Sequence, residues 1–209
     1  MAYSFQTFSV GQVLTAAQMN QVEVNIRDHI HGVSGVSSVL LDVDTSDTTI
    51  VNDATEQTVY SFTVAGGTLS TNRLLRLTVF GEILNNSGTA RTLTLRAKYG
   101  GTQFAGPAIA TIASSASRRA VRLTALLAAD GATNAQQGQA ELHVGSAVGV
   151  AGPDGTATAG AANLDITAHT ALAIDSTTNQ TLLVTVLLGG TAHASWEYVM
   201  RAAYLEAVR

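Results

Sequence analysis

Two histidines one residue apart, His29 and His31, have the side-chain type and spacing that best suit a metal ion. In an extended segment both imidazoles project from one face, and chains arranged around an axis could then share a metal between them. In a helix the two rings point about 200° apart and cannot chelate together. Because the surrounding pattern is helical, we expect His29 to fill a packing position and His31 to face solvent, and we predict no metal site.

A group of acidic residues lies between positions 42 and 56: Asp42, Asp44, Asp47, Asp53 and Glu56. Paired carboxylates of this kind can cleave glycosidic bonds. The first of them also resemble the start of a calcium loop, but that loop needs a glycine sixth and a glutamate twelfth. Asp47 and Asp53 stand at those positions. We therefore expect solvated acids in a turn-rich segment.

The motifs of the common enzyme classes are absent from the sequence. It has no Gly-x-Ser-x-Gly elbow, phosphate-binding loop, dinucleotide fingerprint or His-Glu-x-x-His pair, and no cysteine that could act as a nucleophile. Arg118, Arg119 and Arg122 form a basic cluster, which we expect at a solvated edge or in a subunit contact. We predict that the protein is not an enzyme and binds no cofactor.

The composition narrows the class of protein further. Of the 209 residues, 46% are apolar and 12% are charged, about half the charge of an average domain. The net charge of −4 disfavours a nucleic-acid-binding protein. No apolar run is long enough to cross a membrane, and residues 1–10 lack the features of a secretion signal.

The elements that would carry these side chains differ between the start of the chain and the rest. Thr15 and Gln18 fit a capping box. Apolar side chains then recur at heptad spacing, at Met19, Val22, Ile26, His29 and Val33. We predict a helix over about residues 15–31, within an N-terminal attachment segment of residues 1–38. A helix this short needs a partner surface, which its own β domain, other copies or a larger structure could provide.

From residue 39 onward apolar residues alternate with polar ones, which is typical of antiparallel strands. Gly-rich and Asn-rich turns separate about nine such strands, and this number indicates a sandwich or barrel. We predict an all-β, antiparallel jelly-roll-like β-sandwich over residues 39–209. The low-complexity stretch at residues 145–163 is expected to be a surface loop or an arm packed on a neighbour.

Two strands carry apolar residues on both faces. Residues 181–188 (TLLVTVLL) are apolar apart from their threonines, so we expect a second copy to cover the outer face through Leu183 and Leu187. The last strand should place Trp196, Tyr198 and Tyr204 on one face, with Ala203 on the other. We therefore expect a homo-oligomer that also uses Met19, Val22, Ile26 and His29 for attachment.

The opening of the chain resembles the N-terminal segment of small structural proteins of tailed bacteriophages. The similarity lies in residues 8–20 (FSVGQVLTAAQMN) and 25–32 (NIRDHIHG). Residues 59–64 (VYSFTV), 72–77 (NRLLRL) and 81–88 (GEILNNSG) are similar to the β domain that often follows in those proteins. The resemblance implies a homotrimeric jelly-roll knob on the exterior of the virion, made in the host cytoplasm.

The implied partners are further copies of the chain and other virion proteins, either major capsid or tail proteins. Capsid decoration, a head fibre, and a tail tip or tail fibre all fit the resemblance. The alternative is a receptor-binding or carbohydrate-binding module of the tail. In that case a sugar would stack on an aromatic ring, and Trp196 and the tyrosines are the candidate residues.

Overall fold

The computed structural model describes residues 15–16, 19–20, 38–104, 108–145, 164–166 and 170–208. The chain divides into two compact units, one of residues 1–39 with Arg209 and one of residues 40–208. In the first unit Ala16, Met19 and Asn20 are helical, and the Met19 N–H donates to the Thr15 carbonyl oxygen at 3.0 Å. The predicted helix otherwise lies outside the described residues, as do Val22, Ile26, His29 and His31.

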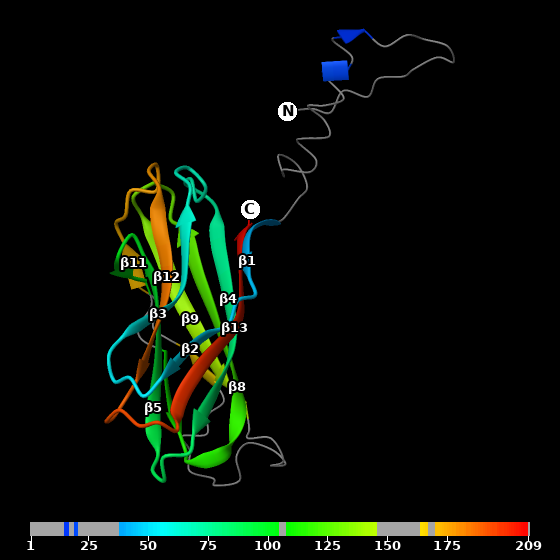
Figure 1. Ribbon diagram of the computed structural model, residues 1–209. Helices are drawn as coiled ribbons and strands as arrows, with labels where there is room; N and C mark the ends of the chain where they lie inside the picture. The colour runs from blue at the N-terminus through cyan, green and yellow to red at the C-terminus, as the bar shows by residue number, and fades with distance from the viewer. Residues whose placement is uncertain are drawn as a thin grey trace. The chain divides into compact units, whose positions relative to one another are not determined.

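The described part of the second unit consists of strands and the turns between them (Figure 1). In chain order the strands are β1 (Ser38–Asp44), β2 (Thr48–Val51), β3 (Gln57–Val64), β4 (Leu74–Asn85), β5 (Arg91–Tyr99), β6 (Thr102–Gln103), β7 (Ala108–Ile112), β8 (Ser115–Ala129), β9 (Gln136–Val144), β10 (Leu164–Ile166), β11 (Thr170–Leu172), β12 (Gln180–Leu188) and β13 (Trp196–Val208). Of the predicted segment 145–163, only Gly145 is described.

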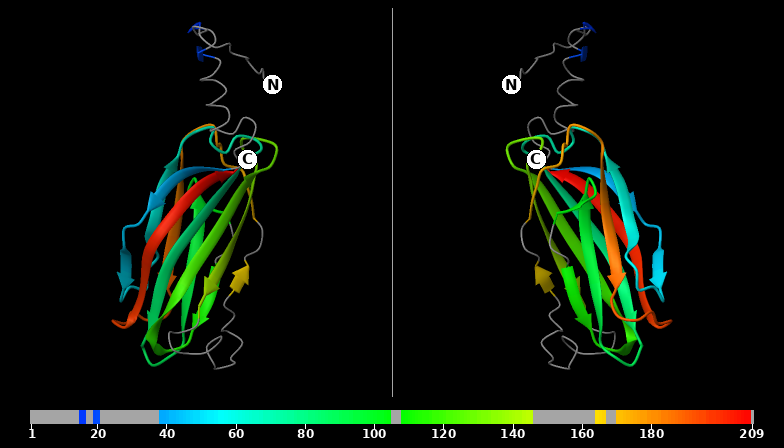
Figure 2. Two further views of the ribbon diagram at one scale, coloured as in Figure 1. Left: turned by 90° about the vertical axis from the view of Figure 1, so that its right-hand side faces the viewer. Right: turned by 90° about the vertical axis from the view of Figure 1, so that its left-hand side faces the viewer.

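The strands form two antiparallel sheets, and the left view of Figure 2 shows the strands of the larger one side by side. Sheet A has eight strands in the order β1-β13-β4-β8-β9-β10, with β2 paired to β13 and β11 to β9. Sheet B has five strands in the order β3-β12-β5-β6, with β7 paired to β5. The order β1/β2-β13-β4-β8 opposite β3-β12-β5-β7 is that of a jelly roll, which confirms the predicted fold class. Strands β9, β10 and β11 widen sheet A.

The predicted turns lie where the strands reverse direction. Gly88 between β4 and β5 has a φ of 84°, and Gly131 between β8 and β9 has a φ of 74°. Only glycine adopts these angles without strain. The Gly-rich pairs of the sequence therefore mark real strand ends.

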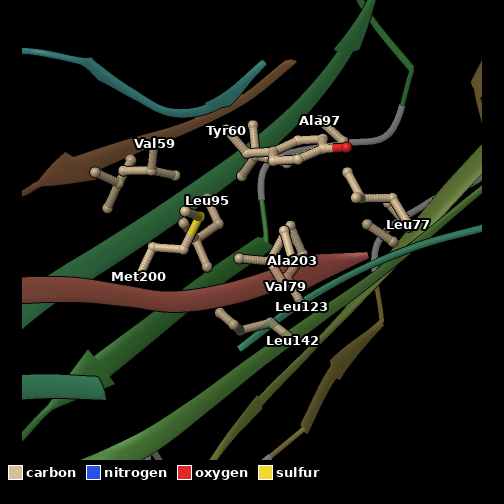
Figure 3. Close-up of a cluster of buried hydrophobic side chains, with 14 of the residues drawn as sticks. Val59, Tyr60, Leu77, Val79, Leu95, Ala97, Leu123, Leu142, Met200 and Ala203 are labelled. Carbon is tan, nitrogen blue, oxygen red and sulfur yellow. The ribbon is translucent and has the colours of Figure 1, made fainter. Parts of the chain in front are cut away.

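The core lies between the two sheets and follows the alternation of the sequence. Side chains from β4, β8, β9 and β13 meet those of β3 and β5 (Figure 3). The labelled members are Val59, Tyr60, Leu77, Val79, Leu95, Ala97, Leu123, Leu142, Met200 and Ala203. Trp196 and Tyr198 are fully buried in the core, as expected from the spacing of the last strand. Trp196 is therefore not available as a sugar-stacking surface.

The prediction for the second half of the last strand is wrong because β13 contains a bulge. Its pairing with β4 shifts between Met200 and Ala202, so Arg201 is an extra residue. Beyond the bulge the two faces exchange: Ala203 is buried in the core, whereas Tyr204 lies on the outer face. A strict period of two could not predict this exchange.

Candidate functional site

A shallow groove of about 460 Å³ lies on the outer face of sheet A. It crosses β13, β4, β8 and the end of β9, which are neighbours in the sheet. Its lining combines small, aromatic and basic residues: Phe80, Gly81, Ala120, Val121, Arg122, His143, Gly145 and Arg201. None of these lining residues carries a carboxylate.

Small residues make the groove hollow. Ala120 and Gly145 are neighbours on β8 and β9, where the Gly145 N–H donates to the Ala120 carbonyl oxygen at 2.8 Å. A Cβ added at Gly145 would lie 3.6 Å from the Ala120 Cβ, which is an ordinary contact. Gly81 differs, because a Cβ there would lie 2.8 Å from the buried Tyr198 hydroxyl, on the core side of the sheet, and so has no room.

An aromatic pair stands beside this hollow. Phe80 is 41% exposed, which is unusual for a phenylalanine in a strand of a packed sandwich. The ring of Tyr204, on the neighbouring strand β13, lies with its centroid 6.1 Å from that of Phe80 and is tilted by 32°. The pair offers a partly solvated apolar surface, which can pack against the C–H face of a ligand.

Some basic side chains of the groove are already paired with a carboxylate of the same chain. Arg201 bonds to both Asp47 and Glu82, and the hydrogen bond that it donates to Glu82 is the main cause that raises the pKa of its guanidinium. A ring nitrogen of His143 lies beside the Glu141 carboxylate.

Arg122 differs from these two residues. Within the described part of the chain its exposed guanidinium has no hydrogen-bond or ion-pair partner. It is therefore the cation of the groove that is available to an anionic ligand.

A second surface lies on the outer face of sheet B, over β12. The Glu56 carboxylate accepts hydrogen bonds from Thr185 Oγ1 at 2.5 Å and Lys98 Nζ at 2.6 Å, and it pairs with Arg96 at 3.1 Å. The hydrogen bond from Lys98 is the largest cause that lowers the pKa of Glu56.

The chain itself therefore covers the middle of β12, where Thr185 is buried. Leu183 and Leu187, on either side of Thr185, are only half-buried. Their predicted role in contacts between copies remains a prediction.

A third surface follows one edge of sheet A. Val39, Leu40 and Val43 on β1 and Val51 on β2 are all exposed, with Leu40 at 58% and Val43 at 53%. Both strands pair with β13 on one side only in the described structure. Such an edge presents unpaired backbone groups together with apolar side chains, which favours pairing with another chain.

The acids that the sequence groups between positions 42 and 56 separate into different structural roles. Asp42 accepts a hydrogen bond from the Tyr60 hydroxyl, Asp44 and Asp53 cap local turns, and Asp47 pairs with Arg201. No group of three or more such side chains in the described ranges is placed to hold a metal ion. The same part of the chain contains no helix long and apolar enough to span a membrane.

The three arginines of the predicted basic cluster also separate. Arg118 lies 2.9 Å from Glu197 and 3.2 Å from Glu82. Arg119 is buried and bonds to the Ala113 carbonyl oxygen at 3.3 Å. Only Arg122 reaches the groove, so the structure does not show a common basic patch.

Sequence reasoning missed Phe80, His143 and Arg201. Phe80 could have been found, because it lies out of phase with the buried Leu77 and Val79 and so must face outward. Tyr204 was among the tyrosines named as candidates, but its outward face could not be predicted, because the bulge at Arg201 reverses it.

Fold and groove together define a jelly-roll domain with a ligand-sized hollow on its wider sheet. No protein-family model matches the sequence, and no curated protein matches it. Among solved structures the fold is similar to the CBM2 module of the evolved Dit of Lactobacillus casei BL23 phage J-1, with 9% identity, a TM-score of 0.34, and coverage of 70% of this chain and 67% of that one.

Two further solved structures are similar to this chain. The C-terminal domain of EclA, a sugar-binding protein, is 12% identical with a TM-score of 0.33, over 83% of this chain and 86% of that one. Peanut lectin, solved with a nine-residue peptide, is 9% identical with a TM-score of 0.33, over 82% and 84%. These similarities are too distant to assign a function or a site to this chain.

Proposed function

We propose that this protein is a non-enzymatic structural component of a tailed-phage virion: a homotrimeric jelly-roll knob attached to the exterior of the particle through residues 1–38. The sequence resemblance of residues 8–20 and 25–32 supports the attachment role. Its partners would be further copies of itself and the capsid or tail proteins beneath it. Decoration of the capsid, a head fibre, and a tail tip or fibre are the placements that the resemblance implies.

The observation that carries the proposal is the apolar β1–β2 edge. Leu40 and Val43 are more than half exposed in a protein with only 12% charged residues. Burial of such side chains between copies stabilises an assembly by about 25 cal/mol per Å². Leu183 and Leu187 on sheet B would add a second contact, and Met19, Val22, Ile26 and His29 would serve for attachment.

Light scattering of the full chain during size-exclusion chromatography tests self-association. The expected mass is three times that of the 21.6 kDa chain. Leu40→Asp with Val43→Asp should shift the protein toward the monomer, because a charge in an apolar contact is costly. Thr49→Asp, at an exposed polar position of β2, is the matched control and should keep the trimer.

Two further measurements complete the test. Ile26→Asp examines the N-terminal segment, and Leu183→Gln with Leu187→Gln examines sheet B, by the same light-scattering experiment. A monomeric wild-type chain at micromolar concentration contradicts the assembly. Labelling of imaged particles with an antibody against the knob tests the virion placement, and particles without label contradict it.

A second function, binding of a receptor or carbohydrate, is favoured by one specific observation. The exposed Phe80 ring borders a hollow floored by Ala120 and Gly145. A glycan array tests this function with the wild type, Phe80→Ala and the groove-filling Ala120→Leu. Binding that both substitutions remove supports it, whereas an array without any Phe80-dependent signal contradicts it.

A further inference from the structure

We infer that the groove on sheet A takes a carboxylated saccharide, whose carboxylate bonds to Arg122 while the apolar face of the sugar packs on Phe80. This inference rests on the second proposed function, carbohydrate binding, and adds the chemical class of the ligand. It needs three things from the structure: a cation without a partner, an aromatic surface next to it, and a lining without carboxylates.

The pairing of the strands places the first two together. Phe80 on β4 lies opposite Arg122 on β8, and Arg122 lies opposite His143 on β9. Side chains directly opposite in neighbouring antiparallel strands have Cβ atoms about 5 Å apart. The three side chains therefore form a row of about 10 Å across the outer face of sheet A.

The ion pairs of sheet A single out Arg122 within this row. Arg118 and Arg201 share Glu82, and they also bind Glu197 and Asp47 respectively. Arg122 has no such carboxylate among the residues that the structure describes. A guanidinium that its own protein leaves unpaired can form the two parallel hydrogen bonds that a carboxylate accepts.

The lining of the groove contains no acidic residue. Arg201 is already bound by Asp47 and Glu82, and His143 lies beside Glu141, so the positive charge that the groove leaves for an anion is that of Arg122. The remaining lining is aromatic or small, which suits the C–H face of a pyranose. The unpaired Arg122 beside the exposed Phe80 ring matches a bound sugar that carries one carboxylate.

The test uses calorimetric titration of the full chain with two matched pairs of probes: hexagalacturonic acid and its methyl ester, and sialyllactose and its methyl ester. In each pair the sugar framework is shared and only the acid form carries the carboxylate. We expect one of the acidic probes to bind at least tenfold more tightly than its neutral partner. Raising NaCl from 50 to 500 mM should weaken that binding, because the salt screens the ion pair.

Variants separate the inference from the function on which it rests. Arg122→Gln should lower the affinity for the acidic probe at least tenfold and leave any neutral binding unchanged. Phe80→Ala should remove the binding of the acidic probe and of its neutral partner. Arg76→Gln is the matched control, because Arg76 is an exposed arginine of the same sheet and bonds to Glu206. This substitution should leave the binding of both probes unchanged. Thermal melts of each variant check that the fold is intact.

Each outcome has a definite meaning. Equal, Phe80-dependent binding of acidic and neutral probes, insensitive to Arg122→Gln, overturns the inference and leaves carbohydrate binding standing. Binding that does not depend on Phe80 or Arg122 places the ligand elsewhere and overturns the inference. If none of the four probes binds while the glycan array shows Phe80-dependent neutral ligands, the inference fails alone. If the array is also negative, the carbohydrate function fails with it.

Discussion

The rings of Phe80 and Tyr204 lie 6.1 Å apart on the outer face of sheet A, on neighbouring strands that run antiparallel. They meet there because Arg201 is an extra residue in β13, which turns Tyr204 away from the core and into the row of Phe80. One bulge thus removes an aromatic side chain from the interior and adds it to the border of the groove.

The aromatic pair should contribute to stability as well as to the surface. We expect Tyr204→Ala and Phe80→Ala each to destabilise the domain, and their effects to be non-additive by about 1 kcal/mol, the typical value of such a pair. A double-mutant cycle in urea unfolding measures this coupling. Strictly additive effects would show that the two rings do not interact in solution.

The two glycines of the groove should respond differently to a methyl group. Gly81→Ala should cost about 2 kcal/mol of unfolding free energy, because the new Cβ meets the Val199 carbonyl oxygen at 2.5 Å and the Tyr198 hydroxyl at 2.8 Å. Gly145→Ala is the matched control and should change stability by less than about 0.5 kcal/mol. Equal midpoints for the two variants in denaturant unfolding would contradict this packing.

Glu56 should make part of the stability depend on pH. Its pKa is lowered in the folded protein, chiefly by the hydrogen bond from Lys98 and then by that from Thr185. The carboxylate therefore stabilises the fold above its unfolded pKa of about 4.5, and this contribution is lost as the pH falls through the lowered folded value.

We expect Glu56→Gln to cost about 1 kcal/mol at pH 7, a small value because the pair is partly solvated. The difference from the wild type should shrink as the pH falls below the unfolded pKa of about 4.5 and on through the lowered folded pKa, because the carboxyl group then becomes protonated in both states. Urea unfolding over this pH range measures it. A difference that does not change with pH would indicate a packing effect rather than an electrostatic one.

Two buried tyrosines should react oppositely to loss of the hydroxyl. The Tyr198 hydroxyl has no hydrogen-bond partner among the described residues, and burial raises its pKa. Tyr198→Phe should therefore be neutral or stabilising by about 1 kcal/mol, since an unpaired buried polar group is costly.

Tyr60 is the matched control. Its hydroxyl donates to Asp42 Oδ2 at 2.8 Å, so Tyr60→Phe should destabilise by about 1–3 kcal/mol. Thermal and urea unfolding of both variants distinguish the two cases. A loss of stability in Tyr198→Phe as large as that in Tyr60→Phe would mean that Tyr198 has a partner in solution, such as a buried water.

The alternation of apolar residues was sufficient to predict the fold class and most of the core. Leu75, Leu77 and Val79 were expected on one face of a strand, and all three are buried. The Gly-rich turns were expected between strands, and Gly88 and Gly131 have the positive φ angles of such turns. These features are local, because strand period and turn geometry depend on residues adjacent in the chain.

The groove depends on contacts that no local pattern contains. Arg118, Arg122 and Arg201 look alike in the sequence, and only the pairing of β4, β8 and β13 shows that Glu82 binds two of them and leaves Arg122 unpaired. The bulge at Arg201 is likewise set by the register between distant strands. The sequence by itself determined the sandwich and the polar and apolar faces of most strands. The tertiary structure decided which arginines form ion pairs and that the Tyr204 ring faces outward. Both depend on strand register, which brings together residues more than a hundred positions apart, such as Glu82 and Arg201.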